Sequence, residues 1–408
     1  MATIRAFGAL RPTNSLVTKV AALPYDVMNT EEAKKMVEGN PYSFLHVDKP
    51  EMHITNPKGD ELYAFAGDTL RRMIKEGVFI KDEPSLYIYG LSNSMTTQYG
   101  LVCLVSAEEY DEGIIKKHEN TRTDKELDRI KHVSYCKAHT GPIFLAYKGL
   151  ELITAWLLEY TAKHEPVYYF IGEDGVKHEV FKVSDPHTIH NITSAFEEAD
   201  ALYIADGHHR AAAAAAVARK YREEGKNSED AQYFLATIFP KEQLCIMDYN
   251  RVLKDESNLN AEQLFNQLQE KFEIEAINET IYKPKERHTF GIRYEKKWYK
   301  LTMKPEWIDE TDPVASLDAS LLQTYVLEPI FKIHDPKGDK RIDFVGGIRG
   351  IEELNRRTDT DMDIAFSMFP TSMDELIRVA DAHQLMPPKS TWFEPKLRSG
   401  IFIHEIND

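Results

Sequence analysis

The residues whose types and spacing most clearly suggest a functional site form the run Asp206-Gly207-His208-His209-Arg210. The run follows a short apolar segment and precedes an alanine-rich one, so it stands at the start of a predicted helix. Glycine tolerates the backbone angles of a sharp turn. The unpaired amides at a helix N-terminus and the positive end of the helix dipole attract anions, and an arginine adds donors. The run therefore predicts an anion-binding site.

Two other interpretations of this run remain open. In the first, Asp206 only caps the helix, the histidines are surface residues, and the alanines belong to a tightly packed core helix. In the second, the aspartate and the histidines bind a metal ion, although adjacent residues on a helix point about 100° apart and rarely share one ion. Cationic side chains at a helix N-terminus cost energy unless an anion is bound, and this conflict favours a functional site.

The elements that must position the turn are an apolar strand at 201–205 and a helix that includes the alanines at 211–216. This helix has the highest helix propensity of the chain. A strand at 142–147, a helix at 151–163 and a strand at 167–170 add an α/β alternation. Closer to the N-terminus we expect helices at 30–37 and 60–76 and a hairpin of strands at 85–89 and 100–105. Residues 116–139 are crowded with charge and predict a solvated surface or a site.

After residue 255 a new series of predicted helices and strands begins. We expect a helix at 261–272, alternating strands at 290–294 and 298–301, a strand at 363–369, a helix at 372–383, a loop at 387–396 and a last strand at 400–405. The fold class is therefore α/β (α+β). We expect a first domain at 1–255 that contains the anion-binding turn, and a C-terminal α+β domain at 256–408 that contributes a loop to the site.

Composition restricts the partners and the compartment. The 408 residues include 50 Lys+Arg against 66 Asp+Glu, a net charge of -16, which disfavours nucleic acid and anionic membrane surfaces. The three cysteines are far apart and fit a reducing compartment. The sequence has neither a signal peptide nor an apolar run of membrane-spanning length, so we expect a cytoplasmic protein whose ligand is a small molecule.

The string DGHHR followed by alanines resembles the phosphate-binding signature of the ParB/sulfiredoxin superfamily, which includes CTP-binding partition proteins, sulfiredoxin and free-serine kinases. The whole chain resembles the bacterial domain-of-unknown-function family 1015 (DUF1015). This second resemblance rests on Pro24-Tyr25-Asp26-Val27, Asn40-Pro41-Tyr42-Ser43-Phe44-Leu45-His46, His118-Glu119-Asn120-Thr121, Asp206 to Arg210 and Pro388-Lys389-Ser390-Thr391. The resemblance implies a ParB/sulfiredoxin-like core with large insertions, and phosphoryl transfer that involves serine or phosphoserine and uses ATP or ADP with Mg²⁺.

The catalytic candidates are His118, Glu119 and His209. Phosphoryl transfer needs charge neutralisation on the phosphoryl oxygens and a group that orients or deprotonates the acceptor. In the free-serine kinases a glutamate upstream of the phosphate turn is the base, and Glu119 lies about ninety residues upstream here. Equally, Glu119 fits a solvated charged loop. Thr121 joins the residues of the turn, 206–210, as a phosphate-binding candidate.

Five residues are candidates for substrate binding. Asp26 fits a role in holding Mg²⁺ or the serine amine, or else a cap of the helix near residue 30. Ser43 and His46 are candidate pocket residues, with turn and core roles as the alternative. Lys389 and Ser390 lie in a proline-bounded loop that fits a phosphate clamp, and charged surface loops have the same composition.

Three functions are consistent with these residues. The first is a serine kinase-like enzyme that moves a phosphoryl group between a nucleotide and serine. The second is a phosphoserine phosphatase-like hydrolase in which a carboxylate or a histidine activates water. The third is a ParB-like nucleotide-binding regulatory protein without catalysis, which the acidic net charge disfavours. A sulfiredoxin-like activity requires a cysteine in the turn, where this chain has His208 and His209.

Overall fold

The computed structural model of the chain describes residues 1–226 and 228–407. The chain forms two compact units. Unit 1 consists of Met1–Leu244 with Pro395–Asp408, and unit 2 of Cys245–Glu394. The predicted limits, 1–255 and 256–408, place the last residues in the second domain, whereas Pro395–Asp408 lie with unit 1. The mixed α/β class that the sequence predicts is confirmed.

Unit 1 contains a nine-stranded mixed sheet. Its strands are β1 (Ile4–Arg5), β4 (Leu86–Ser92), β5 (Thr97–Ser106), β6 (Ile115–Lys116), β8 (Ile143–Tyr147), β9 (Tyr168–Ile171), β10 (Lys177–Val183), β11 (Leu202–Asp206) and β12 (Tyr233–Pro240). The order is β6-β11-β8-β12-β5-β4-β10-β9, with β1 paired to β5. The pairs β6–β11 and β8–β12 are parallel, and the other pairs are antiparallel.

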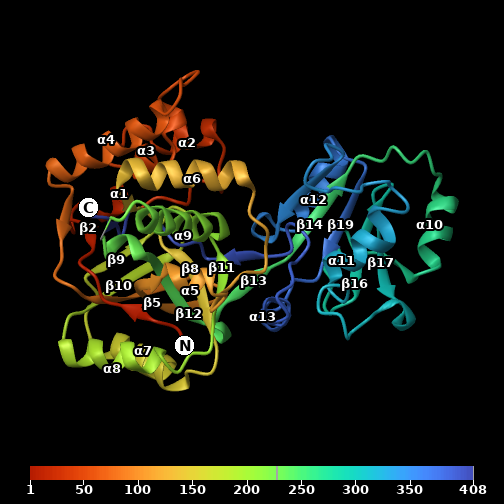
Figure 1. Cartoon of the computed structure of the whole chain (residues 1–408). Coiled ribbons are helices and arrows are strands. Elements are labelled where there is room, and N and C mark those ends of the chain that lie inside the picture. Colours follow the sequence, from red (N-terminus) through yellow and green to blue (C-terminus); the bar gives the residue numbers. More distant parts are fainter. Residues whose placement is uncertain (227, 408) are drawn as a thin grey trace. The chain divides into compact units, whose positions relative to one another are not determined.

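Helices cover both faces of this sheet (Figure 1). They are α1 (Val17–Val20), α2 (Thr30–Met36), α3 (Leu45–Asp48), α4 (Glu61–Lys75), α5 (Ala107–Asp111), α6 (Thr123–Cys136), α7 (Glu151–Lys163), α8 (Pro186–Phe196) and α9 (His208–Glu223), with short 3₁₀ turns at Pro50–Met52, Asp230–Gln232 and Lys241–Gln243. Helix α9 lies on one face and α7 and α8 on the other (Figure 1). Two small pairs complete the unit: β2 (Leu10–Pro12) with β3 (Phe79–Lys81), and β7 (Ala138–His139) with β21 (His404–Glu405).

Helix α9 packs against the sheet through its alanines. Ala211, Ala214 and Ala218 recur on one face of the helix and are buried in the core of the sheet. Because alanine is small, the helix axis can approach the strands closely. This packing places the first turn of α9 directly after the end of β11.

Helix α6 was not predicted, because its buried face is polar. Arg129, His132, Val133 and Cys136 are its buried residues. Hydrophobic periodicity detects a helix only where apolar residues mark the buried side, and two of these four, Arg129 and His132, are polar. The helix packs between α4 and α9, as Figure 1 shows.

Unit 2 is built on a six-stranded antiparallel sheet of order β15-β17-β16-β19-β14-β18. The strands are β14 (Tyr249–Leu253), β15 (Phe272–Ile277), β16 (Thr289–Tyr294), β17 (Lys297–Met303), β18 (Ile342–Gly346) and β19 (Ile364–Met368); β13 (Cys245–Met247) pairs with β20 (Trp392–Glu394). The helices are α10 (Ala261–Gln269), α11 (Asp318–Leu322), α12 (Glu352–Thr360) and α13 (Met373–Asp381), with a π-helical turn at Gln323–Leu327 and 3₁₀ turns at Pro305–Trp307 and Gly347–Arg349.

Most of the other predicted elements are confirmed within a few residues. The helix at 30–37, the helix at 60–76, the hairpin and the strand before the turn all form. The expected last strand at 400–405 is shorter and is confined to β21. Within residues 1–226 and 228–407 no helix is long and apolar enough to cross a membrane.

Candidate anion-binding site

The turn between β11 and α9 has the geometry that an anion site requires. Gly207 has φ 97° and ψ 29°, in the left-handed region that favours glycine. The first helical hydrogen bond runs from the Ala211 amide to the Gly207 carbonyl at 2.9 Å. The N-cap residue of α9 is Gly207, which has no side chain that could cap the first turn. The first backbone amides of a helix have no partner within the helix, so a helix start can donate hydrogen bonds to an anion.

The Arg210 guanidinium lies against this turn. A Cβ atom at Gly207 would lie 3.0 Å from Arg210 Nη2, and one at Gly141 would lie 3.4 Å from Arg210 Nη1. Arg210 Nη1 donates to the Pro142 carbonyl at 2.8 Å. Within the described part of the chain, no carboxylate lies at ion-pair distance from this guanidinium. Because a guanidinium carries five N–H donors, most of its donors remain for a ligand.

Asp206 is not the N-cap of the helix, which corrects one part of the alternative interpretation, whereas the packing of the alanines in the core agrees with another part of it. Its Oδ1 accepts a hydrogen bond from the Gly207 amide at 2.8 Å, and its Oδ2 lies 3.1 Å from Lys396 Nζ. Burial raises the pKa of the Asp206 carboxyl, but the positive charges of Lys396 and Arg210 together lower it by more. The pKa of Asp206 therefore lies far below its ordinary value. Lys396 belongs to the predicted loop at 387–396, and the basic residues of that loop were the sequence signal that it could contribute to the anion site.

Two buried histidines meet beside the turn. The rings of His118 and His208 are 4.4 Å apart at 89°, and the His118 amide donates to His208 Nε2 at 3.4 Å. Burial lowers the pKa of His118 to about 4. Burial and His118 lower the pKa of His208 well below its ordinary value. Both imidazoles are therefore neutral at neutral pH, so they bring hydrogen-bonding capacity and no charge.

The parallel pairing of β6 with β11 explains why distant motifs meet. Leu202 pairs with Ile115 and Tyr203 with Lys116, and the carboxyl ends of parallel strands meet at the same edge of a sheet. The chain therefore leaves β6 next to the start of α9. A second contact follows: the Arg122 amide donates to His209 Nε2 at 3.1 Å.

Glu119 directly follows His118 on this loop and is partly buried. The Thr121 hydroxyl donates to Glu126 Oε2 at 3.1 Å, so it is used at the start of α6. The predicted catalytic segment, 118–121, is thus next to the predicted phosphate turn. The roles assigned to Glu119, His209 and Thr121 stay predictions.

A small cavity adjoins Arg210. Its volume is about 30 Å³, and its polar lining includes Tyr25, Asp48, Arg129, Thr140, Arg210 and Ser399. The Arg129 guanidinium lies 4.0 Å from the centre of the Tyr25 ring and pairs with Asp128 at 2.6 Å. Burial raises the pKa of Tyr25 to about 12, although Arg129 opposes this. Two guanidinium groups therefore face one cavity. Arg129 and Asp48 were not predicted as site residues, because an isolated basic residue in a charged segment is more often part of a surface salt bridge and Asp48 belongs to no site motif.

The structure places the N-terminal substrate candidates outside this lining. Asp26 is exposed and does not cap α2, which corrects one alternative: the Asn29 side chain accepts from the Glu32 amide at 2.9 Å in a capping box. The buried Ser43 hydroxyl accepts from the Leu45 amide at 3.4 Å. His46 Nδ1 lies 2.9 Å from His53 Nε2.

Lys389 and Ser390 belong to unit 2. The Ser390 hydroxyl donates to the Pro387 carbonyl at 2.7 Å, and Lys389 Nζ lies 5.5 Å from the centre of the Tyr249 ring. Both side chains therefore have partners inside their own unit. The phosphate clamp predicted for this loop stays a prediction.

The described residues contain no group of three or more His, Cys, Asp or Glu side chains that could hold a metal ion. Mg²⁺ commonly binds through one or two carboxylates together with phosphate oxygens and water. A Mg²⁺ ion at this site would accordingly enter with the phosphates of its ligand.

The chain is thus a mixed α/β protein with a candidate anion site at the start of α9. Residues 4–320 match the model of the family described as "Protein of unknown function (DUF1015)", and the chain belongs to this family, as its sequence predicts. No curated protein matches the sequence significantly.

Several solved structures are distantly similar to this chain. A free serine kinase mutant in complex with ADP is 13% identical, with a TM-score of 0.39, and the match covers 75% of this chain and 92% of that one. A free serine kinase in complex with AMP is 13% identical, with a TM-score of 0.37, and the match covers 75% of this chain and 91% of that one. SbnI with a C-terminal truncation from Staphylococcus aureus is 10% identical, with a TM-score of 0.35, and the match covers 72% of this chain and 82% of that one.

Proposed function

We propose that this protein is a phosphoryl-transfer enzyme that acts on serine or phosphoserine and uses ATP or ADP with Mg²⁺. The observation that carries the proposal is the Arg210 guanidinium, which lies over Gly207 at the uncapped start of α9 and donates to one carbonyl alone among the described residues. A phosphate placed there would accept from the guanidinium and from the backbone amides. The nucleotide and the serine follow from the sequence resemblance to free-serine kinases.

The neighbouring loop supports a transfer role rather than simple binding. His118 and Arg122 contact the first two residues of α9, so Glu119 between them belongs to the same region. A carboxylate near the phosphate can orient or deprotonate the acceptor hydroxyl. Lys396 offsets the charge of Asp206 and so reduces the repulsion that an incoming phosphate would meet.

The proposal is tested with the full-length chain by titration calorimetry and by a transfer assay. Wild-type protein is titrated with ADP, ATP and phosphoserine in the presence of Mg²⁺, and transfer is followed as nucleotide formed or consumed with serine or phosphoserine. Arg210→Ala is expected to weaken phosphate affinity about tenfold to a hundredfold, the range expected for a charge-assisted hydrogen bond.

Lys220→Ala is the matched control, because it removes one positive charge from the exposed C-terminal end of the same helix. It is expected to leave affinity unchanged. If no phosphate ligand binds to the wild type, or if Arg210→Ala binds as tightly as the control, the proposal is wrong. Release of inorganic phosphate from phosphoserine without nucleotide would instead indicate the hydrolase.

A further inference from the structure

The cavity beside Arg210 contains a buried carboxylate that the phosphate alone does not explain. Asp48 ends α3 and is 4% exposed. Its Oδ1 accepts a hydrogen bond from the Thr140 hydroxyl at 3.0 Å, and His132 Nε2 lies 3.9 Å away. Burial and Arg129 lower the pKa of His132, so this imidazole is neutral and does not balance the carboxylate.

Asp48 has spare hydrogen-bonding capacity. An ionised carboxylate offers about four lone-pair positions, and among the described residues Thr140 donates the one hydrogen bond that it accepts. A buried charge with so few partners is costly unless another group compensates it. The nearby Arg129 guanidinium forms its ion pair with Asp128 at 2.6 Å, and its electrostatic interaction with Asp48 acts over a longer distance.

The lining of the cavity combines the Asp48 carboxylate with two guanidinium groups, those of Arg129 and Arg210. Tyr25, Gly141 and Arg210 are partly exposed, whereas Asp48 and Thr140 are buried. Arg210 therefore lies at a more exposed part of the cavity lining than Asp48. Its volume of about 30 Å³ admits roughly one or two water-sized groups. That space suits a compact donor better than a second phosphate, which Asp48 would repel.

We propose that Asp48 binds the ammonium group of a small ligand whose phosphate lies at Arg210. The substrate class is then an amino alcohol or its phosphate monoester. This inference rests on the proposed function, because it takes the phosphate at Arg210 as given. It assigns to Asp48 the recognition of the amine, a role separate from any proton transfer by Glu119.

Two isosteric ligands test the inference on the wild-type protein. O-Phosphoethanolamine and propyl phosphate have the same chain length and the same phosphate, and they differ in a terminal ammonium against a methyl group. Calorimetry is expected to show a preference for the amine of about tenfold or more. Equal affinities for the two ligands would overturn the inference.

The Asp48→Asn variant provides the second test. It keeps an acceptor for Thr140 and removes the charge, so the preference for the amine should fall to about one while propyl phosphate binds as tightly as before or more tightly. Asp68→Asn, which removes an exposed carboxylate from α4, is the matched control and should keep the preference. A preference unchanged in Asp48→Asn would refute the assignment.

A second variant with a milder change tests the inference if Asp48→Asn does not fold. Thr140→Ala leaves the charge in place and removes the hydroxyl that orients it, so the preference should be reduced without loss of phosphate binding. The two proposals fail differently. If ADP, ATP and phosphoserine also fail to bind to the wild type, the proposed function is wrong, whereas equal binding of the two test ligands, or failure of both where phosphoserine binds, refutes the role of Asp48 alone.

Discussion

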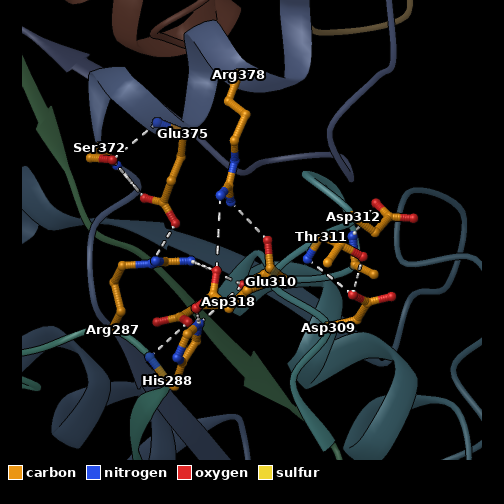
Figure 2. A network of polar contacts seen from close by, with 12 residues as sticks. Arg287, His288, Asp309, Glu310, Thr311, Asp312, Asp318, Ser372, Glu375 and Arg378 are labelled. Carbon is orange, nitrogen blue, oxygen red and sulfur yellow. Dashed lines mark hydrogen bonds and ion pairs between the residues drawn. The ribbon is translucent and has the colours of Figure 1, made fainter. Parts of the chain in front are cut away.

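Asp318→Asn should change the pH dependence of unfolding of unit 2. Asp318 begins α11 and lies in the polar network of Figure 2. It is 8% exposed, its Oδ1 accepts from the His288 amide at 2.9 Å, and its Oδ2 has no hydrogen-bond partner among the described residues. Burial raises its pKa from 3.8 to about 7, and Glu375 adds to this while Arg287 and Arg251 oppose it.

The direction and size of the effect follow from proton linkage. Between about pH 4 and pH 7 the folded carboxyl keeps a proton that the unfolded chain has released, so the free energy of unfolding falls as pH rises through this window. A pKa raised from 3.8 to about 7 corresponds to about 4 kcal/mol at full ionisation. Asp318→Asn removes this loss, so at pH 8 the variant should be more stable than the wild type by up to about 4 kcal/mol.

Urea titrations between pH 4 and 8, followed by tryptophan fluorescence, provide the measurement. Three of the four tryptophans, Trp298, Trp307 and Trp392, lie in unit 2, and a Trp156→Phe background removes the one in unit 1. The pKa of the His288 ring is lowered by burial and acts in the opposite direction, so the informative quantity is the difference between variant and parent. Asp309→Asn, in an exposed turn, is the control. Identical pH profiles for Asp318→Asn and its parent would refute the reasoning.

Three further predictions concern the anion site. Gly207→Ala should cost about 1–2 kcal/mol and weaken phosphate binding, because φ is 97° and the new Cβ would lie 3.0 Å from Arg210 Nη2; thermal unfolding and calorimetry check this. His118→Gln should flatten the loss of stability between about pH 6.5 and 4, since the folded imidazole, with its pKa lowered to about 4, stays neutral where the unfolded one takes up a proton; a steeper profile would contradict this. Lys396→Met should weaken phosphate affinity by leaving Asp206 unbalanced, and adding Asp206→Asn should restore part of it in a double-mutant cycle.

Much of the fold was predictable because its signals are local. The strand before Gly207, the alanine-rich helix after it and the capping box of the helix at residue 30 depend on neighbouring residues. Helix α6 was not predictable in the same way, since Arg129 and His132 occupy positions where a pattern search expects apolar residues. Their burial depends on partners such as Tyr25, which is about a hundred residues away in the chain.

The sequence by itself determined the turn: a glycine for the left-handed backbone, strong helix formers after it and an arginine in the first helical turn. Only the tertiary structure decided which groups surround that turn. Parallel pairing of β6 with β11 placed His118 against His208, and the return of residues 395–408 to unit 1 brought Lys396 to Asp206. Backbone conformation depends on a few adjacent residues, whereas the charge balance of a buried site depends on strand order, which joins residues far apart in the chain.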